Sequence, residues 1–331
     1  MTERSVAIVG ATGAVGQDLM AVLASRNVPL RSLRLLASTR SVGERRTFRG
    51  ESLPVEVLGP ESFRGVDVAI FSAGASVSRE YAARAVAAGT IVIDNSSAFR
   101  LDPKVPLVVP EVNSAALNGH CGIISNPNCS TILLVLALSP LHIEAGLEAV
   151  VVSTYQAASG AGQLAMLELR SGMRAMLADE PFEPKVLTQQ LAGTVFPHVD
   201  VLQADGYTRE EDKLRDETRK ILGLPQLPVE ATCVRVPVER CHSESVSVRL
   251  SRPLLPAAAR ALFASAPGLL LCDEPQQNRY PMPLTMAFRD PVAIGRIRVS
   301  RVFENGLAFW LSGDQLRKGA ALNAIQIAEL V

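Results

Sequence analysis

The sequence has no excess charge of either sign and no apolar run long enough to cross a membrane. Lysine plus arginine and aspartate plus glutamate number 33 each, so the formal net charge is zero. A chain with this balance has no overall attraction to nucleic acid or to an anionic membrane surface, and any anion site must be local. The longest apolar runs, such as residues 132–138, fall far short of the about 20 residues that a transmembrane helix needs. We therefore predict no nucleic-acid partner and no membrane partner.

Cysteine is scarce and odd in number, and the N-terminus lacks the pattern of a secretory signal. The five cysteines show no spacing typical of metal ligands, so we predict no metal site. Residues 1–5 run directly into an apolar, strand-like stretch, without a basic region, apolar core and cleavage site in succession. An odd set of thiols suits a reducing compartment better than a disulfide framework. A cytoplasmic location is therefore expected.

The length of 331 residues exceeds the size at which one hydrophobic core usually stops growing, which favours two domains. In the first third of the chain, short β-rich runs alternate with amphipathic stretches, a rhythm typical of βαβ units in a parallel sheet. Residues 243–250 instead alternate strictly between polar and apolar, which indicates a half-exposed antiparallel or mixed sheet.

We predict an α/β fold in which a Rossmann-type, doubly wound parallel sheet is joined to a second α+β domain. The apolar spacing of residues 314–331 has a helical rhythm that ends the chain. The first domain is expected to comprise residues 1–128 plus 314–331. The second is expected to comprise residues 129–313.

A glycine-rich turn follows the first predicted strand and opens a helix, the context in which such a pattern indicates dinucleotide binding. Glycines allow a tight turn and let backbone N–H groups approach a pyrophosphate at the helix N-terminus. An ordinary tight turn is the alternative reading. The candidate cofactor residues here are Gly10, Thr12, Gly13, Ala14, Val15 and Gly16.

The turn after the second predicted strand has no acidic residue, although NAD enzymes usually place one there to bind the ribose hydroxyls. It has Ser38, Arg40 and Ser41 instead. An arginine with two hydroxyls suits a 2′-phosphate, so NADP is predicted in preference to NAD. The alternative is a solvated turn, since Arg45 and Arg46 follow closely.

Cys129 lies between a strand-like run and an apolar helix, and is therefore predicted at a helix N-terminus. The helix dipole and the unpaired N–H groups there stabilise a thiolate, the form that attacks carbonyls. For Cys121, Cys233 and Cys272 an inert thiol is the better interpretation. Among the four histidines, His242 is the best candidate proton acceptor, and Arg235, seven residues upstream, has the geometry to hold a carboxylate.

Several strings together resemble the successive signatures of aspartate-semialdehyde dehydrogenases, especially their shorter bacterial branch. The strings are GATGAVG, DNSSAFR, VVPEVN, SNPNCST, STYQAASGAG, CVRVPVERCHSESV and KGAALNAIQIAE, and they occur in the family's order along nearly the whole chain. In one respect the chain departs from the pattern, because Cys241 stands directly before His242, where glycine is frequent.

The resemblance implies roles for matching positions. Cys129 matches the nucleophile, His242 the acid/base and Gln156 the amide that orients the substrate. Substrate contacts are implied for Arg235, Glu210, Arg100, Lys213 and Asn128, with Arg100 and Lys213 as the phosphate pair. Further NADP contacts are implied for Ser159, Gly160 and Gln315.

The resemblance further implies a homodimer that reduces 4-phospho-L-aspartate with NADPH to L-aspartate 4-semialdehyde and phosphate, reversibly, through a Cys129 thioester. This reaction precedes lysine, methionine, threonine, isoleucine and diaminopimelate biosynthesis. Three alternatives are an N-acetyl-glutamyl-phosphate reductase, a catalytically silent paralogue and a nucleotide-sensing module. SNPNCST disfavours the first, and the combination of Cys129, Gln156, Arg235 and His242 disfavours the others.

Overall fold

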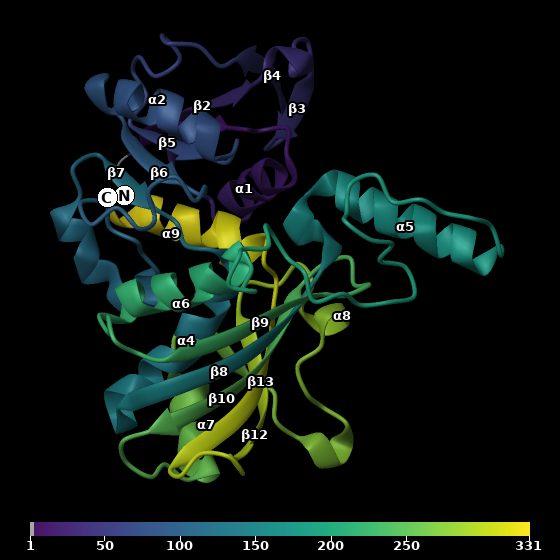
Figure 1. Ribbon diagram of the computed structural model, residues 1–331. Coiled ribbons are helices and arrows are strands. Elements are labelled where there is room, and N and C mark those ends of the chain that lie inside the picture. The colour runs from purple at the N-terminus through teal and green to yellow at the C-terminus, as the bar shows by residue number, and fades with distance from the viewer. Residues whose placement is uncertain (1–2) are drawn as a thin grey trace. The chain divides into compact units, whose positions relative to one another are not determined.

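The computed structural model describes residues 3–331, which divide into two compact units (Figure 1). One unit ends at Asn128 and is completed by Ala320–Val331, and the other is Cys129–Gly319. Residues 314–319, expected with the first unit, therefore belong to the second. Asp314 explains the difference, because its buried carboxylate accepts the backbone N–H groups of Leu316 at 3.0 Å and of Phe288 at 2.7 Å. These bonds tie the start of the tail to the second unit.

A seven-stranded sheet forms the first unit, in the order β3-β4-β2-β1-β5-β6-β7. Neighbouring strands are parallel except for the β3/β4 hairpin. The strands are β1 (Arg4–Val9), β2 (Leu30–Ala37), β3 (Arg45–Phe48), β4 (Glu51–Val57), β5 (Val68–Phe71), β6 (Ile91–Asp94) and β7 (Ile123–Ser125). The helices are α1 (Ala14–Ser25), η1 (Thr39–Ser41), α2 (Ala75–Ala87), α3 (Pro110–Asn113), η2 (Ser114–Gly119) and α9 (Leu322–Leu330). Strand β2 and its neighbours lie on one side of β1, and β5, β6 and β7 lie on the other side. This reversal of strand order at β1 confirms the doubly wound fold.

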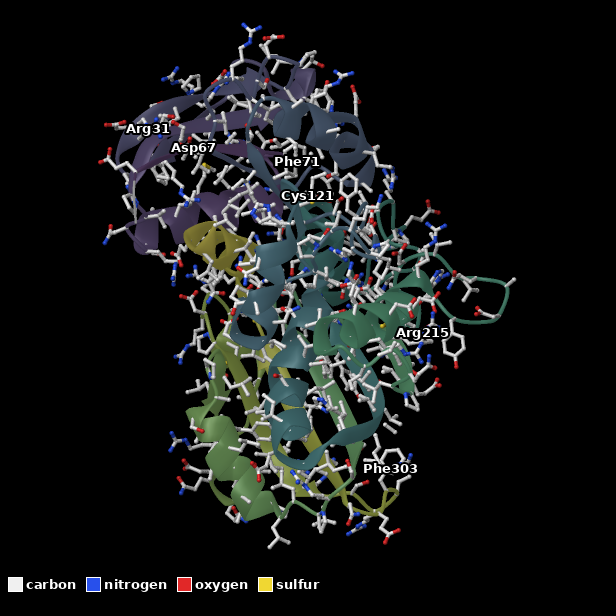
Figure 2. All side chains as sticks on the ribbon, turned by 90° about the vertical axis from the view of Figure 1, so that its left-hand side faces the viewer. Arg31, Asp67, Phe71, Cys121, Arg215 and Phe303 are labelled. Carbon is white, nitrogen blue, oxygen red and sulfur yellow. The ribbon has the colours of Figure 1, made fainter. Side chains whose placement is uncertain are left out.

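Alternate residues of the central strand pack on opposite faces of this sheet. Ile8 lies in a core with Leu19 of α1 and Ile325 of α9. The opposite face packs under α2, where Ala82 lies against a cluster that includes Phe71. Figure 2 shows Phe71 among the side chains of this interior, where it is fully buried. From Val6 to Val9, strand β1 is therefore apolar at every position, as expected for a parallel strand covered on both sides.

A six-stranded mixed sheet forms the second unit, in the order β11-β12-β13-β10-β8-β9. The strands are β8 (Leu147–Gln156), β9 (Val229–Arg235), β10 (His242–Leu250), β11 (Leu269–Leu271), β12 (Val292–Val299) and β13 (Gly306–Gly313). The helices are α4 (Cys129–Ala145), η3 (Ala158–Ala161), α5 (Gln163–Leu177), α6 (Arg209–Leu222), α7 (Pro256–Ser265), η4 (Pro275–Gln277) and α8 (Pro283–Met286). Strand β10 is antiparallel to both β8 and β13, which confirms the sheet type predicted from residues 243–250. A π-helix, η5 (Arg317–Ala321), then leads into α9.

One face of the mixed sheet is covered by helices, and α4 is the most deeply buried of them. It packs against β8, β10 and β13, while α6 contacts β9 and α7 contacts β11 and β12. Because α4 is covered on nearly all sides, its residues are apolar around the whole helix rather than along one stripe. The other face of the sheet carries Tyr155 and Trp310, whose ring centroids lie 5.0 Å apart, and Val151, which is 42% exposed. No helix within residues 3–331 is long and apolar enough to cross a membrane.

Candidate active site

Cys129 is the first residue of α4, where the sequence predicted it, and its side chain is half-buried. The first N–H groups of an α-helix have no partner within the helix, so this position favours a negatively charged sulfur. The chain returns close to the cysteine at Gly319, where an added Cβ would stand only 3.0 Å from the Cβ of Cys129. Glycine therefore keeps the backbone close to the candidate nucleophile.

Gln156, at the end of β8, is buried and connects the start of α4 to α6. Its side-chain Nε2 donates to Ser130 Oγ at 2.6 Å and to Glu210 Oε1 at 2.9 Å. Ser130 follows the candidate nucleophile directly, so the amide is held one residue away from Cys129. This network fixes the orientation of Gln156.

His242 begins β10 next to the end of β8, and its ring is 1% exposed. Its Nδ1 accepts the backbone N–H of Ala157 at 3.0 Å. A neutral ring whose Nδ1 accepts a hydrogen bond carries its own proton on Nε2. Burial, together with the positive charge of Arg235, lowers the pKa of His242 to about 3, although the carboxylate of Glu210 acts in the opposite direction. The ring is therefore neutral near pH 7 and offers an N–H donor at Nε2.

Arg235 ends β9 and, like His242, hydrogen-bonds to the backbone of Ala157, with 6% of its surface exposed. Its Nη1 donates to the backbone oxygen of Ala157 at 2.6 Å. Burial lowers its pKa, while the negative charges of Glu210 and of the Cys129 thiolate partly offset this effect. An added Cβ at Gly160 would stand 3.1 Å from both Arg235 Nη1 and His242 Nε2, so a glycine is needed beside these two groups.

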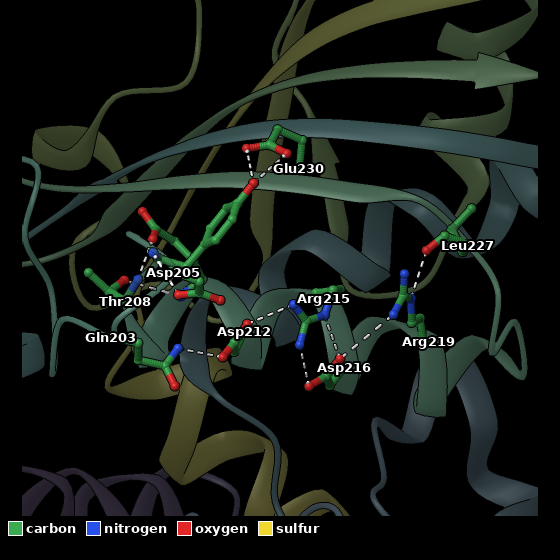
Figure 3. Close-up of polar contacts among 11 residues, drawn as sticks. Gln203, Asp205, Thr208, Asp212, Arg215, Asp216, Arg219, Leu227 and Glu230 are labelled. Atoms are coloured by element: carbon green, nitrogen blue, oxygen red, sulfur yellow. Dashed lines mark hydrogen bonds and ion pairs between the residues drawn. The ribbon is translucent and has the colours of Figure 1, made fainter.

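Glu210 and Lys213 lie on the first turns of α6, which begins with a capping box. Thr208 Oγ1 accepts the Glu211 N–H at 3.4 Å, and Glu211 Oε2 accepts the Thr208 N–H at 2.6 Å. Farther along, Asp212 pairs with Arg215 at 2.8 Å (Figure 3). The cap fixes where α6 starts and so places Glu210 one residue from its beginning.

Lys213 is shared by two carboxylates. Its Nζ lies 2.9 Å from Glu210 Oε2 and 2.5 Å from Asp200 Oδ2. Burial lowers its pKa, but the two carboxylates outweigh that effect and raise the value above the ordinary range. Lys213 is therefore an ammonium group near neutral pH.

Arg100, the other member of the predicted phosphate pair, and Asn128, a further predicted substrate contact, belong to the first unit and are both buried. The guanidinium of Arg100 donates from Nε to the backbone oxygen of Asn126 at 3.0 Å and from Nη2 to that of Asn95 at 2.7 Å. These two asparagines directly follow β6 and β7. Arg100 thus lies at the carboxyl ends of parallel strands, where ligands bind in folds of this kind.

The glycine-rich turn of the first unit depends on glycine at two positions. Gly10 has φ +89°, and an added Cβ there would stand 2.5 Å from the backbone oxygen of Ser72. At Gly16 it would stand 2.4 Å from the oxygen of Gly10. Gly13 lies just before α1, and the first-turn N–H groups of Ala14, Val15 and Gly16 have no acceptor within the helix. The geometry suits a pyrophosphate.

The turn that carries Arg40 lies against this glycine-rich loop, because Ser41 Oγ donates to Thr12 Oγ1 at 3.3 Å. The two neighbouring arginines already have local partners: Arg45 Nε binds Ser52 Oγ at 2.8 Å, and Arg46 Nη2 binds Glu44 at 2.5 Å. Arg40 is exposed and forms no ion pair within the described part of the chain. This difference favours Arg40 over its neighbours as a 2′-phosphate ligand.

Ser159 and Gln315, two of the predicted NADP contacts in the second unit, are hydrogen-bonded to each other, with Gln315 Nε2 donating to Ser159 Oγ. The amide oxygen of Gln315 accepts the N–H of Cys241 at 2.8 Å. Gln315 therefore holds the backbone that leads into His242.

The thiols of Cys233 and Cys241 are buried, and burial raises the pKa of each above its ordinary range. Cys241 packs with Met286 and Ala293. Within residues 3–331, no group of three or more His, Cys, Asp or Glu side chains has an arrangement that would hold a metal ion. The thiol beside His242 is therefore an apolar packing group.

Four contacts of the site were not predicted from the sequence. They are made by Ser130, Ala157, Asp200 and Gly319. Ser130 and Gly319 lie within the strings SNPNCST and KGAALNAIQIAE, so a signal for them was present. Ala157 likewise lies within STYQAASGAG, whereas nothing in the sequence pointed to Asp200.

Comparisons with known proteins match both units. Residues 5–120 match the family described as semialdehyde dehydrogenase, NAD binding domain, and residues 138–318 match semialdehyde dehydrogenase, dimerisation domain. The aspartate-semialdehyde dehydrogenase of Aquifex aeolicus is 50% identical over 331 residues, covering 98% of this chain and 97% of that protein.

Solved structures are similar over the same length. The crystal structure of aspartate semialdehyde dehydrogenase II from Vibrio cholerae, complexed with ASA, has a TM-score of 0.95 at 40% identity and covers 100% of this chain and 98% of that chain. The Candida albicans enzyme, crystallised with NADP, has a TM-score of 0.79 at 26% identity and covers 99% of this chain and 98% of that chain.

A nucleotide-binding Rossmann unit, joined to a unit that carries a cysteine at a helix start and a buried neutral histidine, defines an NAD(P)-dependent semialdehyde dehydrogenase. Fold, site and comparisons agree on this class. The chain belongs to the aspartate-semialdehyde dehydrogenase family.

Proposed function

We propose that the protein reduces 4-phospho-L-aspartate with NADPH to L-aspartate 4-semialdehyde and phosphate, and catalyses the reverse reaction. The observation that carries the proposal is the group formed by Cys129, Gln156, Arg235 and His242 in the second unit. A silent paralogue or a nucleotide sensor has no need of these side chains. The identities to aspartate-semialdehyde dehydrogenases disfavour an N-acetyl-glutamyl-phosphate reductase.

In the proposed mechanism, Cys129 is the nucleophile. Its thiolate attacks C4 of the acyl phosphate, a carbon–sulfur bond forms, and the carbon–oxygen bond to phosphate breaks with its electron pair leaving on phosphate. The product is a thioester on Cys129, whose position Gln156 helps to fix through its bond to the neighbouring Ser130. NADPH, when bound, supplies the hydride that reduces this thioester.

His242 acts in this mechanism as a hydrogen-bond donor. The steps at C4 start from a thiolate, pass through an oxyanion and return to a thiolate, so none of them needs a base; the one proton that the overall reduction takes up goes from solvent to the departing phosphate. The Nε2–H of a neutral His242 is suited to hold that oxyanion, because its Nδ1 is already occupied by Ala157. This role refines the acid/base function implied by the family resemblance.

The substrate's charged groups match the remaining side chains. Arg235 presents a planar fork for the α-carboxylate, and Glu210 presents a carboxylate for the ammonium. Arg100 and Lys213 are proposed to bind the phosphate, and Asn128 is proposed as a further substrate contact. A small dianion needs such local cations in a chain without net charge.

For the cofactor, the glycine-rich turn is proposed to hold the pyrophosphate through the backbone of Gly10, Thr12, Gly13, Ala14, Val15 and Gly16. Ser38, Arg40 and Ser41 are proposed to hold the 2′-phosphate, and Ser159, Gly160 and Gln315 to contact the cofactor from the second unit. Support comes from the close backbone approach at Gly10 and Gly16 and from the lack of an ion pair at Arg40 within the described residues.

A homodimer is proposed as the working state. Residues 138–318 match a dimerisation domain, and the face of the mixed sheet that lacks α4 exposes Val151 beside the Tyr155–Trp310 pair. An apolar face of this kind is typical of subunit interfaces. Val151→Glu is expected to shift the mass measured by light scattering toward the monomer. The cytoplasmic location stays a prediction.

The proposed function is tested by NADP reduction with L-aspartate 4-semialdehyde, with and without phosphate. N-acetyl-L-glutamate 5-semialdehyde serves as the competing substrate. We expect phosphate-dependent NADPH formation with the first substrate alone. Turnover with the acetylated substrate alone, or with neither, would contradict the proposal.

A further inference from the structure

Lys213 is the centre of a charged group that carries more negative than positive charge. Its ammonium contacts Glu210 at 2.9 Å and Asp200 at 2.5 Å, and Glu210 also accepts the amide of Gln156 at 2.9 Å. Glu210 is 5% exposed, whereas the side chains of Lys213 and Asp200 are 24% and 30% exposed. An ammonium group has three N–H donors, and two of them point at these carboxylates. Lys213 keeps one donor for a further anion.

Asp200 is held in place by its own backbone as well as by Lys213. It has φ +67°, a left-handed conformation that aspartate adopts more readily than most residues. Its Oδ1 accepts the N–H of Val201 at 2.8 Å, and the oxygen of Val201 accepts the N–H of Arg209 at 2.9 Å, where α6 begins. The carboxylate is therefore fixed relative to the first turn of α6.

The two carboxylates and one ammonium group have a formal charge of −1, whereas Lys213 and Glu210 alone would sum to zero. Without Asp200, Lys213 would neutralise Glu210 and would present its charge more strongly to phosphate. With Asp200, part of the lysine charge is compensated elsewhere, so Glu210 keeps its attraction for a cation.

We infer that Asp200 is a specificity-determining residue that sets the balance between the two substrates of this site. It strengthens the hold of Glu210 on the ammonium of L-aspartate 4-semialdehyde and weakens the hold of Lys213 on phosphate. The inference rests on the proposed function. A site that must release phosphate in the reducing direction benefits from the weaker hold.

Asp200→Asn removes the charge and keeps both the shape of the side chain and the oxygen that accepts the Val201 N–H. Asp200→Gly is the second variant, because glycine adopts a positive φ without strain. We expect the Michaelis constant for phosphate to fall and that for the semialdehyde to rise, each by roughly 3- to 10-fold for a partly screened unit charge. Looser packing alone would raise both Michaelis constants. A fall in the constant for phosphate together with a rise in the constant for the semialdehyde therefore identifies the electrostatic effect.

Asp205→Asn is the matched control, since it removes a charge from the same segment. Its carboxylate accepts the N–H of Tyr207 at 3.1 Å near the start of α6 (Figure 3). Both constants are expected to stay unchanged in this variant. If the constants move in parallel, or stay unchanged, in Asp200→Asn and Asp200→Gly of an active enzyme, the inference alone is overturned. If the unmodified protein shows no phosphate-dependent activity, the proposed function fails and the inference fails with it.

Discussion

Replacing His242 by glutamine and by alanine separates a hydrogen-bond donor from a base. The ring has one nitrogen bound to the Ala157 N–H at 3.0 Å, and its pKa is lowered to about 3 by burial and by Arg235. At pH 7, about one ring in 10⁴ is then protonated. Accepting a proton at Nε2 requires the other tautomer, which leaves the buried N–H of Ala157 without an acceptor at a cost of about 1–3 kcal/mol.

A donor role sets the size of the effect. Loss of one preorganised oxyanion donor reduces kcat by roughly 10²- to 10³-fold. We therefore expect the kcat of His242→Ala to be lower than that of the unmodified protein by this factor. Glutamine places an amide N–H near the position of Nε2 and is expected to recover about 10-fold of the loss. Initial rates of NADP reduction at saturating semialdehyde and phosphate measure both variants.

The pH profile gives a second readout. A histidine with a pKa of about 3 leaves no inflection from this ring between pH 5.5 and 7.5 in kcat/KM. The donor account is refuted if glutamine is as inactive as alanine, or if an inflection in this range disappears in both variants. The disappearance of such an inflection would show that His242 exchanges a proton during turnover.

Three further predictions concern single side chains. Arg40→Asp is expected to raise the Michaelis constant for NADP by about 10-fold or more and to erase the preference for NADP over NAD, because a charge-assisted contact with the 2′-phosphate is lost. Equal use of NADP and NAD by the unmodified protein would contradict this role of Arg40. Arg235→Lys keeps the positive charge but loses the planar pair of N–H donors that binds a carboxylate. The Michaelis constant for the semialdehyde should therefore rise by about 10-fold, and that for phosphate should stay constant. A parallel rise in both constants would indicate a structural role for Arg235. Glu244 is fully buried, its carboxyl oxygens have no hydrogen-bond partner within residues 3–331, and burial raises its pKa well above 4.5. In the native state Glu244 keeps a proton that the unfolded chain releases above its own pKa of about 4.5. The free energy of unfolding therefore decreases by about 1.4 kcal/mol per pH unit as the pH rises from about 4.5 toward the native pKa. Urea unfolding at several pH values should show a smaller loss for Glu244→Gln, and an equal loss in both proteins would exclude this origin.

Features that depend on neighbours in the chain were predictable from the sequence. The start of α4 at Cys129 follows from a short strand, a polar turn and an apolar run. The glycine-rich turn before α1 and the alternation along β10 likewise reflect local geometry, with Gly10 forced by a positive φ. Each of these is a property of consecutive residues.

Contacts that depend on strand register and on long connections were not predictable. Ala157 and His242 are 85 residues apart and meet because β8 and β10 are antiparallel, with Tyr155 opposite Ser243. Asp200 reaches Lys213 from an irregular segment 13 residues earlier. The expected helix over residues 314–331 begins instead as a π-helix at Arg317, because the side chain of Asp314 accepts the N–H groups of Leu316 and Arg317 in the manner of a residue that precedes a helix.

The central claim is that Cys129 carries the acyl group, and it is tested most directly by mass spectrometry of the protein mixed with 4-phospho-L-aspartate in the absence of NADPH. The account predicts release of one phosphate per active site and an aspartyl adduct on the peptide that contains Cys129. Cys129→Ser, which keeps the fold but replaces the thiolate by an un-ionised hydroxyl, should give neither while still binding NADP. An adduct on Cys241, or turnover by Cys129→Ser, would contradict it.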